Sequence, residues 1–432
     1  MEKTVQIYTR SERIKITALA VFGSYVEWYD YFVAATAAAL VWPAIFFSAF
    51  PVLGTAFSIA AFGVSYFTRP LGAYVFGHFG DKYGRKSSLI FTLLTVGIGM
   101  IGISALPSAT AIGLAAPILL FIFRAIQGMG FGGEYGGAAT WVLEVNAMSK
   151  WRATWTSLTM AVIGLGSATG AGLYVYLSSI FSRQDLLNFW WRVPFIIGVI
   201  LLFSAALIRY FALESNIFVK LKQEGKVLKN PANVAVKKHI GLMLLIATTW
   251  LYIFWTNPAL IQLFATPFLA KHGIPSIYVT YTLLISNIII FFTTILGGFL
   301  SDLVGRRTTI VLSALLVAIF VYPYTILIQS GNLLYILIAQ ILINAFAFIG
   351  EGAFTAYFPE IYRAQYRYTG SGMSYQFAAM YMGFVYSFGL PYIVSLSNPI
   401  PVVIGVTLLF CILSLIVRLK VWQETRGVDI SD

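Results

Sequence analysis

The amino-acid sequence predicts an all-α membrane protein in which twelve transmembrane helices form two pseudo-symmetric six-helix bundles. Three observations predict this fold: long apolar runs, a one-sided distribution of Lys and Arg, and a motif repeated about half a chain length apart. The chain has 432 residues, of which 59% are hydrophobic and 10% are charged. Soluble domains carry roughly 25% charged residues, and disordered chains combine low hydrophobicity with high charge. The composition therefore excludes both classes.

The apolar runs define the expected spans. A membrane-spanning helix needs about 20 mostly apolar residues. The first run is too long for a cleavable signal peptide and contains Glu27 and Asp30, so we expect it to remain as a span. The twelve expected spans lie near residues 16–42, 52–77, 87–106, 115–143, 152–181, 192–212, 240–270, 276–300, 308–329, 332–358, 368–396 and 400–418.

The basic residues predict how the chain is oriented. Of the 28 Lys and Arg residues, 23 fall on one side of the membrane, in the two terminal segments, in the connections on that side or at the span ends beside them. Arg183, Arg192 and Lys271 fall on the other side, and Arg69 and Arg124 lie inside spans. Cytoplasmic loops carry an excess of Lys and Arg. We therefore expect a cell-membrane protein with both termini in the cytoplasm. The net charge of +12 is then an orientation signal, and no nucleic-acid partner is expected.

The sequence offers little material for metal or enzyme chemistry. A single cysteine, Cys411, excludes an intrachain disulfide, and His78, His239 and His272 are far apart in the sequence. The glycine-rich string 133–137 is not followed by the Gly-Lys-Ser/Thr of a phosphate loop. No credible nucleophile and base fall together inside the spans. We expect no metal, no cofactor and no enzymatic activity.

A ten-residue motif occurs twice. Residues 77–86 read GHFGDKYGRK and residues 298–307 read GFLSDLVGRR, so both fit G-x-x-x-D-x-x-G-R-basic. Each copy lies between the second and third expected span of its half. Such a repeat predicts two parallel six-span bundles. We assign residues 1–212 and 239–432 to the bundles and residues 213–238, a polar and amphipathic stretch, to a cytoplasmic linker.

The motif has a mechanical interpretation. Its glycines permit a tight turn and close helix approach. Its Asp can face the N-terminus of the helix that follows, and its Arg can pair with a carboxylate on a neighbouring helix. We expect an ionic latch that holds the cytoplasmic side shut, and the alternative is a loop that only fixes topology. The expected gate residues are Gly77, Asp81, Gly84, Arg85, Glu144, Arg152, Gly298, Asp302, Gly305, Arg306, Glu360 and Arg367.

Several ionisable residues fall inside the expected spans, where each costs about 2.5–3.5 kcal/mol. Glu27 and Asp30 are three residues apart and share a helix face. Protonating either one would release a paired arginine and change the helix pairing, which is a proton-driven switch. The alternatives are static ion pairs and, for Glu134, a structural hydrogen bond. The expected proton-coupling residues are Glu27, Asp30, Arg124 and Glu134.

The two halves differ in this buried charge. Shifted by the 221 residues that separate the motifs (298 minus 77), Asp30 falls on Leu251 and Arg124 on Ala345. We infer that the N-terminal half carries the coupling chemistry and the C-terminal half supplies more of the neutral substrate surface. The expected substrate-binding residues are Trp28, Tyr31, Arg69, Gln127, Tyr252, Trp255, Asn257, Glu351, Tyr375 and Gln376.

A set of strings gives a resemblance to a known family. They are Glu27–Asp30, Arg69–Gly72, Gly80–Lys86, Arg124–Gly128, Gly132–Ala138, Trp191–Phe195, Phe358–Glu360, Arg367–Gly370 and Glu424–Gly427. Together they resemble the metabolite:proton symporters of the major facilitator superfamily, over nearly the whole chain. The resemblance implies a two-domain carrier that works by alternating access with proton symport.

The same resemblance implies a substrate class. Family members carry proline and betaine, citrate, α-ketoglutarate or shikimate, all of which bear a carboxylate that Arg69 and Arg124 would suit. Gln376 stands where relatives usually have Asn, and Glu351 and the string 386–391 are unusual beside the family pattern.

The sequence therefore predicts a proton-coupled transporter of a small organic acid or zwitterionic metabolite, monomeric and surrounded by lipid. Two alternatives stay open. One is a uniporter or exchanger of sugar-like or drug-like solutes, and the other is a non-transporting membrane sensor. Uptake driven by acidification would separate symport from the first alternative.

Overall fold

The computed structural model describes residues 8–50, 53–265, 268–269, 272–419 and 422–431. These residues form helices, turns and connecting segments, without a strand among them. Lys3, Lys271 and Lys420, which contribute to the expected charge distribution, lie outside the described residues.

The first half is a series of long helices joined by short ones. Its elements are α1 (Arg10–Leu40), α2 (Trp42–Phe46), α3 (Gly54–Tyr83), α4 (Arg85–Ala105), α5 (Ala109–Ile112), α6 (Ala115–Val145), α7 (Arg152–Ala161), α8 (Ile163–Ile180), α9 (Arg183–Asn188), η1 (Trp190–Arg192) and α10 (Val193–Tyr210). Helices α7 and α8 meet at Val162 and together form one apolar segment long enough to cross a membrane.

The second half repeats this arrangement with more interruptions. Its elements are α12 (Pro231–Thr249), α13 (Leu251–Phe254), the π-helix η2 (Trp255–Ala265), α15 (Ser276–Val304), α16 (Arg306–Gln329), α17 (Leu333–Ile361), η3 (Ala364–Tyr366), α18 (Arg367–Phe384), the π-helix η4 (Val385–Gly389), α19 (Leu390–Ser395), α20 (Ile400–Ser414) and η5 (Leu415–Arg418). Between the halves, α11 (Asn216–Gln223) lies inside the expected linker, and α12 begins before the linker's expected end. Over its described residues, each expected span coincides with one helix or with consecutive helical segments; residues 52, 266–267 and 270 of the expected spans lie outside the described residues.

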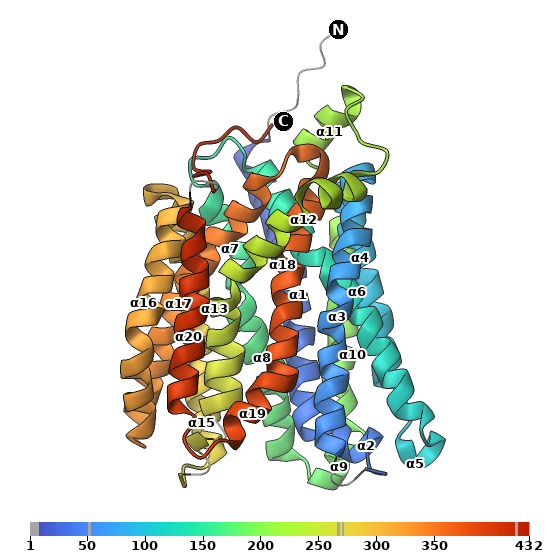
Figure 1. The fold of residues 1–432 in the computed structure, drawn as a ribbon. Coiled ribbons are helices and arrows are strands. Elements are labelled where there is room, and N and C mark those ends of the chain that lie inside the picture. The colour runs from blue at the N-terminus through green and yellow to red at the C-terminus, as the bar shows by residue number, and fades with distance from the viewer. Residues whose placement is uncertain (1–7, 51–52, 266–267, 270–271, 420–421, 432) are drawn as a thin grey trace.

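Eight segments of the described chain are long and apolar enough to cross a membrane. A ninth is counted if α12 and Leu251–Asn257, which are bent by 41° relative to each other, form one span. Helices α1 and α3 are as long, with 31 and 30 residues, but they carry Glu27, Asp30 and Arg69 in their interiors. All these helices run side by side in one bundle (Figure 1). These buried charged residues lower the mean apolarity of α1 and α3, although both helices are long enough to cross a membrane.

Both described ends of the chain lie at one end of the bundle, together with α11, whereas α5, α9 and α19 lie at the other (Figure 1). We call the first the charged end, because the repeated motifs at 77–86 and 298–307 turn there. Helices α3 and α6 touch backbone to backbone. A Cβ placed on Gly132 would lie 2.1 Å from the carbonyl oxygen of Arg69, so small residues are required at this contact.

Candidate functional site

Asp81, at the end of α3, lies on the first turn of α18 in the opposite half. Its carboxylate accepts hydrogen bonds from the backbone N–H groups of Tyr368 (3.1 Å) and Thr369 (2.9 Å) and from the Thr369 hydroxyl (2.7 Å). A carboxylate at a helix N-terminus satisfies free N–H groups and faces the positive end of the helix dipole. The expectation that this Asp faces the helix following it is wrong, because the cap crosses between the halves.

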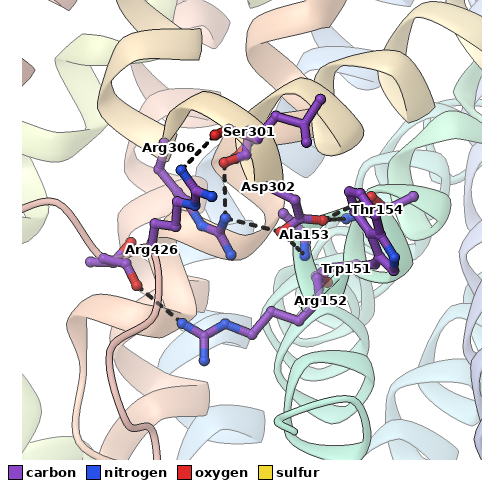
Figure 2. Close-up of polar contacts among 12 residues, drawn as sticks. Trp151, Arg152, Ala153, Thr154, Ser301, Asp302, Arg306 and Arg426 are labelled. Carbon is purple, nitrogen blue, oxygen red and sulfur yellow. Dashed lines mark hydrogen bonds and ion pairs between the residues drawn. The ribbon is translucent and has the colours of Figure 1, made fainter. Parts of the chain in front are cut away.

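Asp302 repeats the arrangement at the end of α15. It accepts hydrogen bonds from the backbone N–H groups of Ala153 (3.1 Å) and Thr154 (2.8 Å) at the start of α7, and from the Thr154 hydroxyl (2.8 Å). Figure 2 shows these contacts together with Arg306, which donates to Asp302 at 3.0 Å and to the Ser301 carbonyl. Each half therefore caps a helix of the other at the same point of the repeat.

Glu144, at the end of α6, binds an arginine from each half. Arg85 of its own half donates two hydrogen bonds to it at 3.0 and 3.1 Å, and Arg367 of the opposite half donates one at 2.9 Å. All three side chains are buried. Arg85 also donates to the Ala364 carbonyl at 2.7 Å, so a second contact from this arginine crosses the interface.

Glu360, at the end of α17, is the counterpart of Glu144. Arg306 of its own half donates at 2.9 and 3.1 Å, and Arg152 of the opposite half donates at 2.6 Å. The guanidinium of Arg152 also donates to the carbonyls of Thr425 and Val428. The charged end thus holds two matched ion clusters, each of which contains residues from both halves.

Four glycines allow this geometry. Gly84 and Gly305 have φ values of +120° and +100°, where a side chain would be strained. At Gly77 an added Cβ would lie 2.7 Å from the Cα of Thr369, and at Gly298 it would lie 2.8 Å from the Ala153 carbonyl oxygen. The motif glycines therefore bring α3 against α18 and α15 against α7.

A second duplicated pair, missed from the sequence, supports each cluster. Glu214 accepts from the backbone N–H groups of Arg85 (3.0 Å) and Lys86 (3.1 Å), and Glu424 accepts in the same way from the first residues of α16. The next residues, Ser215 and Thr425, donate their hydroxyls to the cluster glutamates. Burial raises the pKa of the Glu214 carboxyl above its usual value. The signal was a Glu-Ser/Thr pair soon after the last span of each half.

A polar chain links α1 to α6 inside the bundle. The Gln127 amide donates to both carboxylate oxygens of Asp30 at 3.1 and 3.2 Å, and its oxygen accepts from Arg124 at 2.6 Å. Arg124 also donates to the Ser65 hydroxyl and the Phe62 carbonyl. Asp30, Gln127 and Arg124 are all buried. Gln127, expected to bind substrate, instead bridges the two charged groups.

The other carboxylates of the first half have different surroundings. Glu134 forms a buried ion pair with Arg209 of α10 and accepts from the Thr92 hydroxyl at 2.8 Å. Glu27 is 5% exposed and has neither a hydrogen-bond nor an ion-pair partner in the described part of the chain. Asp30, Arg124 and Glu27 are therefore buried within protein, and none of them faces outward toward lipid.

A cavity lies between the halves. Six of the ten residues expected to bind substrate line it: Trp28, Tyr31, Arg69, Asn257, Glu351 and Tyr375. The sequence interpretation missed the remaining lining residues, which are apolar or aromatic: Phe32, Tyr66, Ile163, Trp250, Ile253, Phe254 and Phe348.

Two expected residues of the seventh span do not line the cavity. The Tyr252 hydroxyl shares a hydrogen bond with Ser313 of α16 at 2.8 Å, and the indole N–H of Trp255 donates to Thr407 of α20 at 2.8 Å. The cavity instead meets positions 250, 253, 254 and 257. This i, i+3, i+4, i+7 spacing is one helix face, and positions 252 and 255 fall off it. The aromatic stripe was visible in the sequence.

Gln376 of α18 is also placed outside the cavity lining. Its amide donates to the backbone carbonyls of Phe131 and Gly132 at 3.2 and 3.3 Å, so it connects α18 to α6 across the halves. Elsewhere in the described residues, no group of three or more His, Cys, Asp or Glu side chains could hold a metal ion.

The comparisons with known proteins agree on one kind of molecule. The family model described as Major Facilitator Superfamily matches residues 28–387 of this chain. The inner membrane metabolite transport protein YhjE of Escherichia coli (strain K12) is 33% identical over 385 residues, covering 86% of this chain and 85% of that protein. The shikimate transporter of the same organism is 31% identical over 385 residues, covering 87% and 86%.

Among solved structures, the proton:xylose symporter XylE of E. coli, bound to 6-bromo-6-deoxy-D-glucose, aligns with a TM-score of 0.77. The alignment covers 98% of each chain at 17% sequence identity. This likeness concerns the fold alone.

Proposed function

The chain belongs to the major facilitator superfamily and is a multi-pass membrane transporter rather than an enzyme; from this premise we propose that it carries a small organic acid or zwitterionic metabolite in symport with protons. The observation that carries the proposal is the chain Asp30–Gln127–Arg124, buried in the bundle that walls the cavity. A buried carboxylate that does not directly contact its arginine can take up a proton without breaking an ion pair.

Asp30 is the proposed proton acceptor. As a carboxylate it accepts both hydrogen bonds from the Gln127 amide. Once protonated it becomes a donor at one oxygen and still accepts at the other, so the amide either keeps one of its two hydrogen bonds or turns its oxygen toward the new donor. In the second case Gln127 would present a different group to Arg124, and in both cases the contacts between α1 and α6 would change. Glu27 is a second candidate acceptor, whereas Glu134, held by Arg209 and Thr92, is proposed to be static.

Arg69 is the proposed contact for the substrate carboxylate. It lines the cavity and makes no hydrogen bond or ion pair with any described side chain or backbone group. The rings of Tyr66 and Phe131 lie 5.1 Å from its guanidinium carbon. A guanidinium suits a carboxylate through paired hydrogen bonds, and an unpaired one beside a cavity retains them for a ligand.

The two ion clusters are the proposed gate. They join the halves at the charged end, which we propose faces the cytoplasm because basic residues concentrate there. Alternating access then requires both clusters to break when the cavity opens to the cytoplasm. We propose residues 1–212 and 239–432 as the two bodies that rock against each other within a single monomer.

Purified protein in proteoliposomes tests the proposal. A thermal-shift screen of carboxylates, amino acids, betaines and sugars identifies a ligand, since binding to the folded state raises its stability. Uptake of that ligand is then measured with and without an inwardly directed pH gradient. The proposal expects accumulation only with the gradient, and a proton ionophore should abolish it. Equal uptake under both conditions would favour a uniporter or exchanger instead.

A further inference from the structure

Glu351 of α17 is a buried carboxylate that lines the cavity from the second half. It is 1% exposed. One of its oxygens, Oε2, accepts a hydrogen bond from the indole N–H of Trp250 at 2.5 Å. The other, Oε1, has no hydrogen-bond partner. No lysine, arginine or histidine of the described chain forms an ion pair with it. Burying a carboxylate without a cation costs free energy. The described residues supply no cation to offset that cost.

The surroundings of Glu351 suit a cation that carries carbon groups. The ring centroid of Trp250 lies 4.0 Å from that of Tyr375 and 5.2 Å from that of Phe254, and all three residues line the cavity. Aromatic faces attract cations, and such rings recognise quaternary ammonium groups in other proteins. The wall around the free oxygen is therefore aromatic and acidic at once.

The opposite wall carries the complementary charge. Arg69 of α3 lines the same cavity and forms no hydrogen bond or close ion pair with a described carboxylate, although Glu27 and Asp30 interact with it at longer range. The cavity is therefore lined by one guanidinium from the first half and one carboxyl group from the second, neither of which forms an ion pair among the described residues. A plain carboxylic acid would satisfy Arg69 but would offer no cation to Glu351. A plain ammonium compound would leave Arg69 unpaired.

We infer that this carrier takes zwitterions, with the substrate carboxylate on Arg69 and its ammonium group between Glu351 and the rings of Trp250 and Tyr375. The inference rests on the transport function proposed above and narrows its substrate class. A zwitterion would join the two halves through one molecule, because each of its charges meets a different half. Binding would then favour the state in which the halves close around the cavity.

Matched ligands test the charge requirement. Glycine betaine and tert-butylacetate have the same shape, but only the first carries a positive nitrogen. L-proline and cyclopentanecarboxylate form a second such pair. Binding to purified protein is measured by calorimetry for each compound. We expect at least one zwitterion to bind roughly thirtyfold or more tightly than its carbon analogue, as for other buried charge contacts.

Variants then test whether Glu351 is the residue that causes the preference for a positive nitrogen. Glu351→Gln removes the charge with little change in shape and should reduce the difference within each pair to about threefold or less. Glu224→Gln makes the same chemical change at an exposed position near α11 and should preserve the full difference. If Glu351→Gln does not fold, Glu351→Asp should retain the preference for zwitterions at lower affinity, and Trp250→Phe should retain it too.

Three results would overturn the inference: carbon analogues that bind wild-type protein as tightly as the zwitterions, failure of every betaine and amino acid to bind, or a Glu351→Gln variant with undiminished discrimination. These results are distinct from failure of symport. A plain acid taken up with protons would uphold the proposed function and defeat this inference. Zwitterions that need Glu351 for binding but are taken up equally with and without the pH gradient would uphold this inference and defeat proton symport.

Discussion

The two halves of the chain match at the charged end and differ inside the bundle. At the charged end, Asp81 and Asp302 cap helices of the opposite half, and Glu144 and Glu360 each hold two arginines. Every element of one cluster has a counterpart in the other. If the two ion clusters form the proposed gate, both are needed, because one cluster alone would leave the other side of the interface free to open.

Inside the bundle the symmetry fails. The first half buries the polar chain from Asp30 to Arg124 and the ion pair of Glu134 with Arg209. The second half places one carboxylate, Glu351, at the cavity and breaks its spans with the π-helices η2 and η4. π-helical turns are rare and concentrate at functional sites. Under the proposed function, proton coupling would use the one copy in the first half, and the second half would supply the adaptable substrate wall.

The largest expected effect is that of Asp30→Asn, which removes the proposed proton site from the first half. For a net-neutral substrate carried with one proton, about 100 mV supplies roughly 2.3 kcal/mol, or a roughly fortyfold accumulation. The variant should accumulate nothing above equilibrium, because no proton is carried, yet it should still exchange labelled for unlabelled substrate. Both are measured in proteoliposomes. Gradient-driven uptake that persists in this variant would place coupling elsewhere.

The next effect tests the symmetry of the gate. Glu144→Gln and Glu360→Gln each remove a carboxylate shared by two buried arginines. Arg85 keeps Asp81 at 3.5 Å and Arg306 keeps Asp302 at 3.0 Å, whereas Arg367 and Arg152 lose their ion-pair partner. Removing one partner of a buried ion pair costs about 3–5 kcal/mol. Both variants should shift the protein toward a state open at the charged end, and to similar extents because the clusters match.

The measurement is thiol labelling of Ala73→Cys, a buried position of α3 that faces α18. The background carries Cys411→Ala, which removes the native cysteine. A membrane-impermeant thiol reagent applied at the charged end should label both variants faster than the parent. If only one glutamate matters, the duplicated clusters are not equivalent. If neither matters, they are not a gate.

The sequence was sufficient for the fold, and it named six of the residues that line the cavity. The apolar runs and the repeated motif predict the helical order, and a set of strings resembles the family. The comparisons confirm the fold and the superfamily. The buried charges were identified because a charge in a long apolar run is conspicuous. Pairings across the halves were less accessible. The helix capped by Asp81 lies nearly 290 positions further along the chain, and no local pattern indicates which helix end it meets.

Cavity-facing residues of the second half were predicted least well. Tyr252 and Trp255 were chosen for their chemistry, but the helix face that meets the cavity is fixed by the periodicity of Trp250, Phe254 and Asn257. Polar aromatic side chains can also be satisfied inside a helix bundle, so residue type alone does not separate a substrate contact from a structural one.

A third prediction sharpens the assignment of the substrate wall. Phe254→Ala removes a ring that lines the cavity and lies against Tyr375. Substrate affinity should fall roughly tenfold or more, because large aromatic contacts dominate such sites. Calorimetry with the ligand found by the screen measures this, and thermal unfolding of the empty protein reports any separate loss of stability. Unchanged affinity would move the binding site out of this cavity.

The smallest expected effect is that of Tyr252→Phe, two positions away on the same segment. The variant loses only the hydroxyl that shares a hydrogen bond with Ser313, which should cost about 1 kcal/mol of stability. Affinity should change less than about twofold, because the ring faces α16 and not the cavity. Ser313→Ala is the matched control, and the double variant should be no less stable than the sum of the single effects implies. A large loss of affinity in Tyr252→Phe, with stability intact, would show that this tyrosine contacts the substrate. The seventh span would then turn a different face to the cavity when substrate binds.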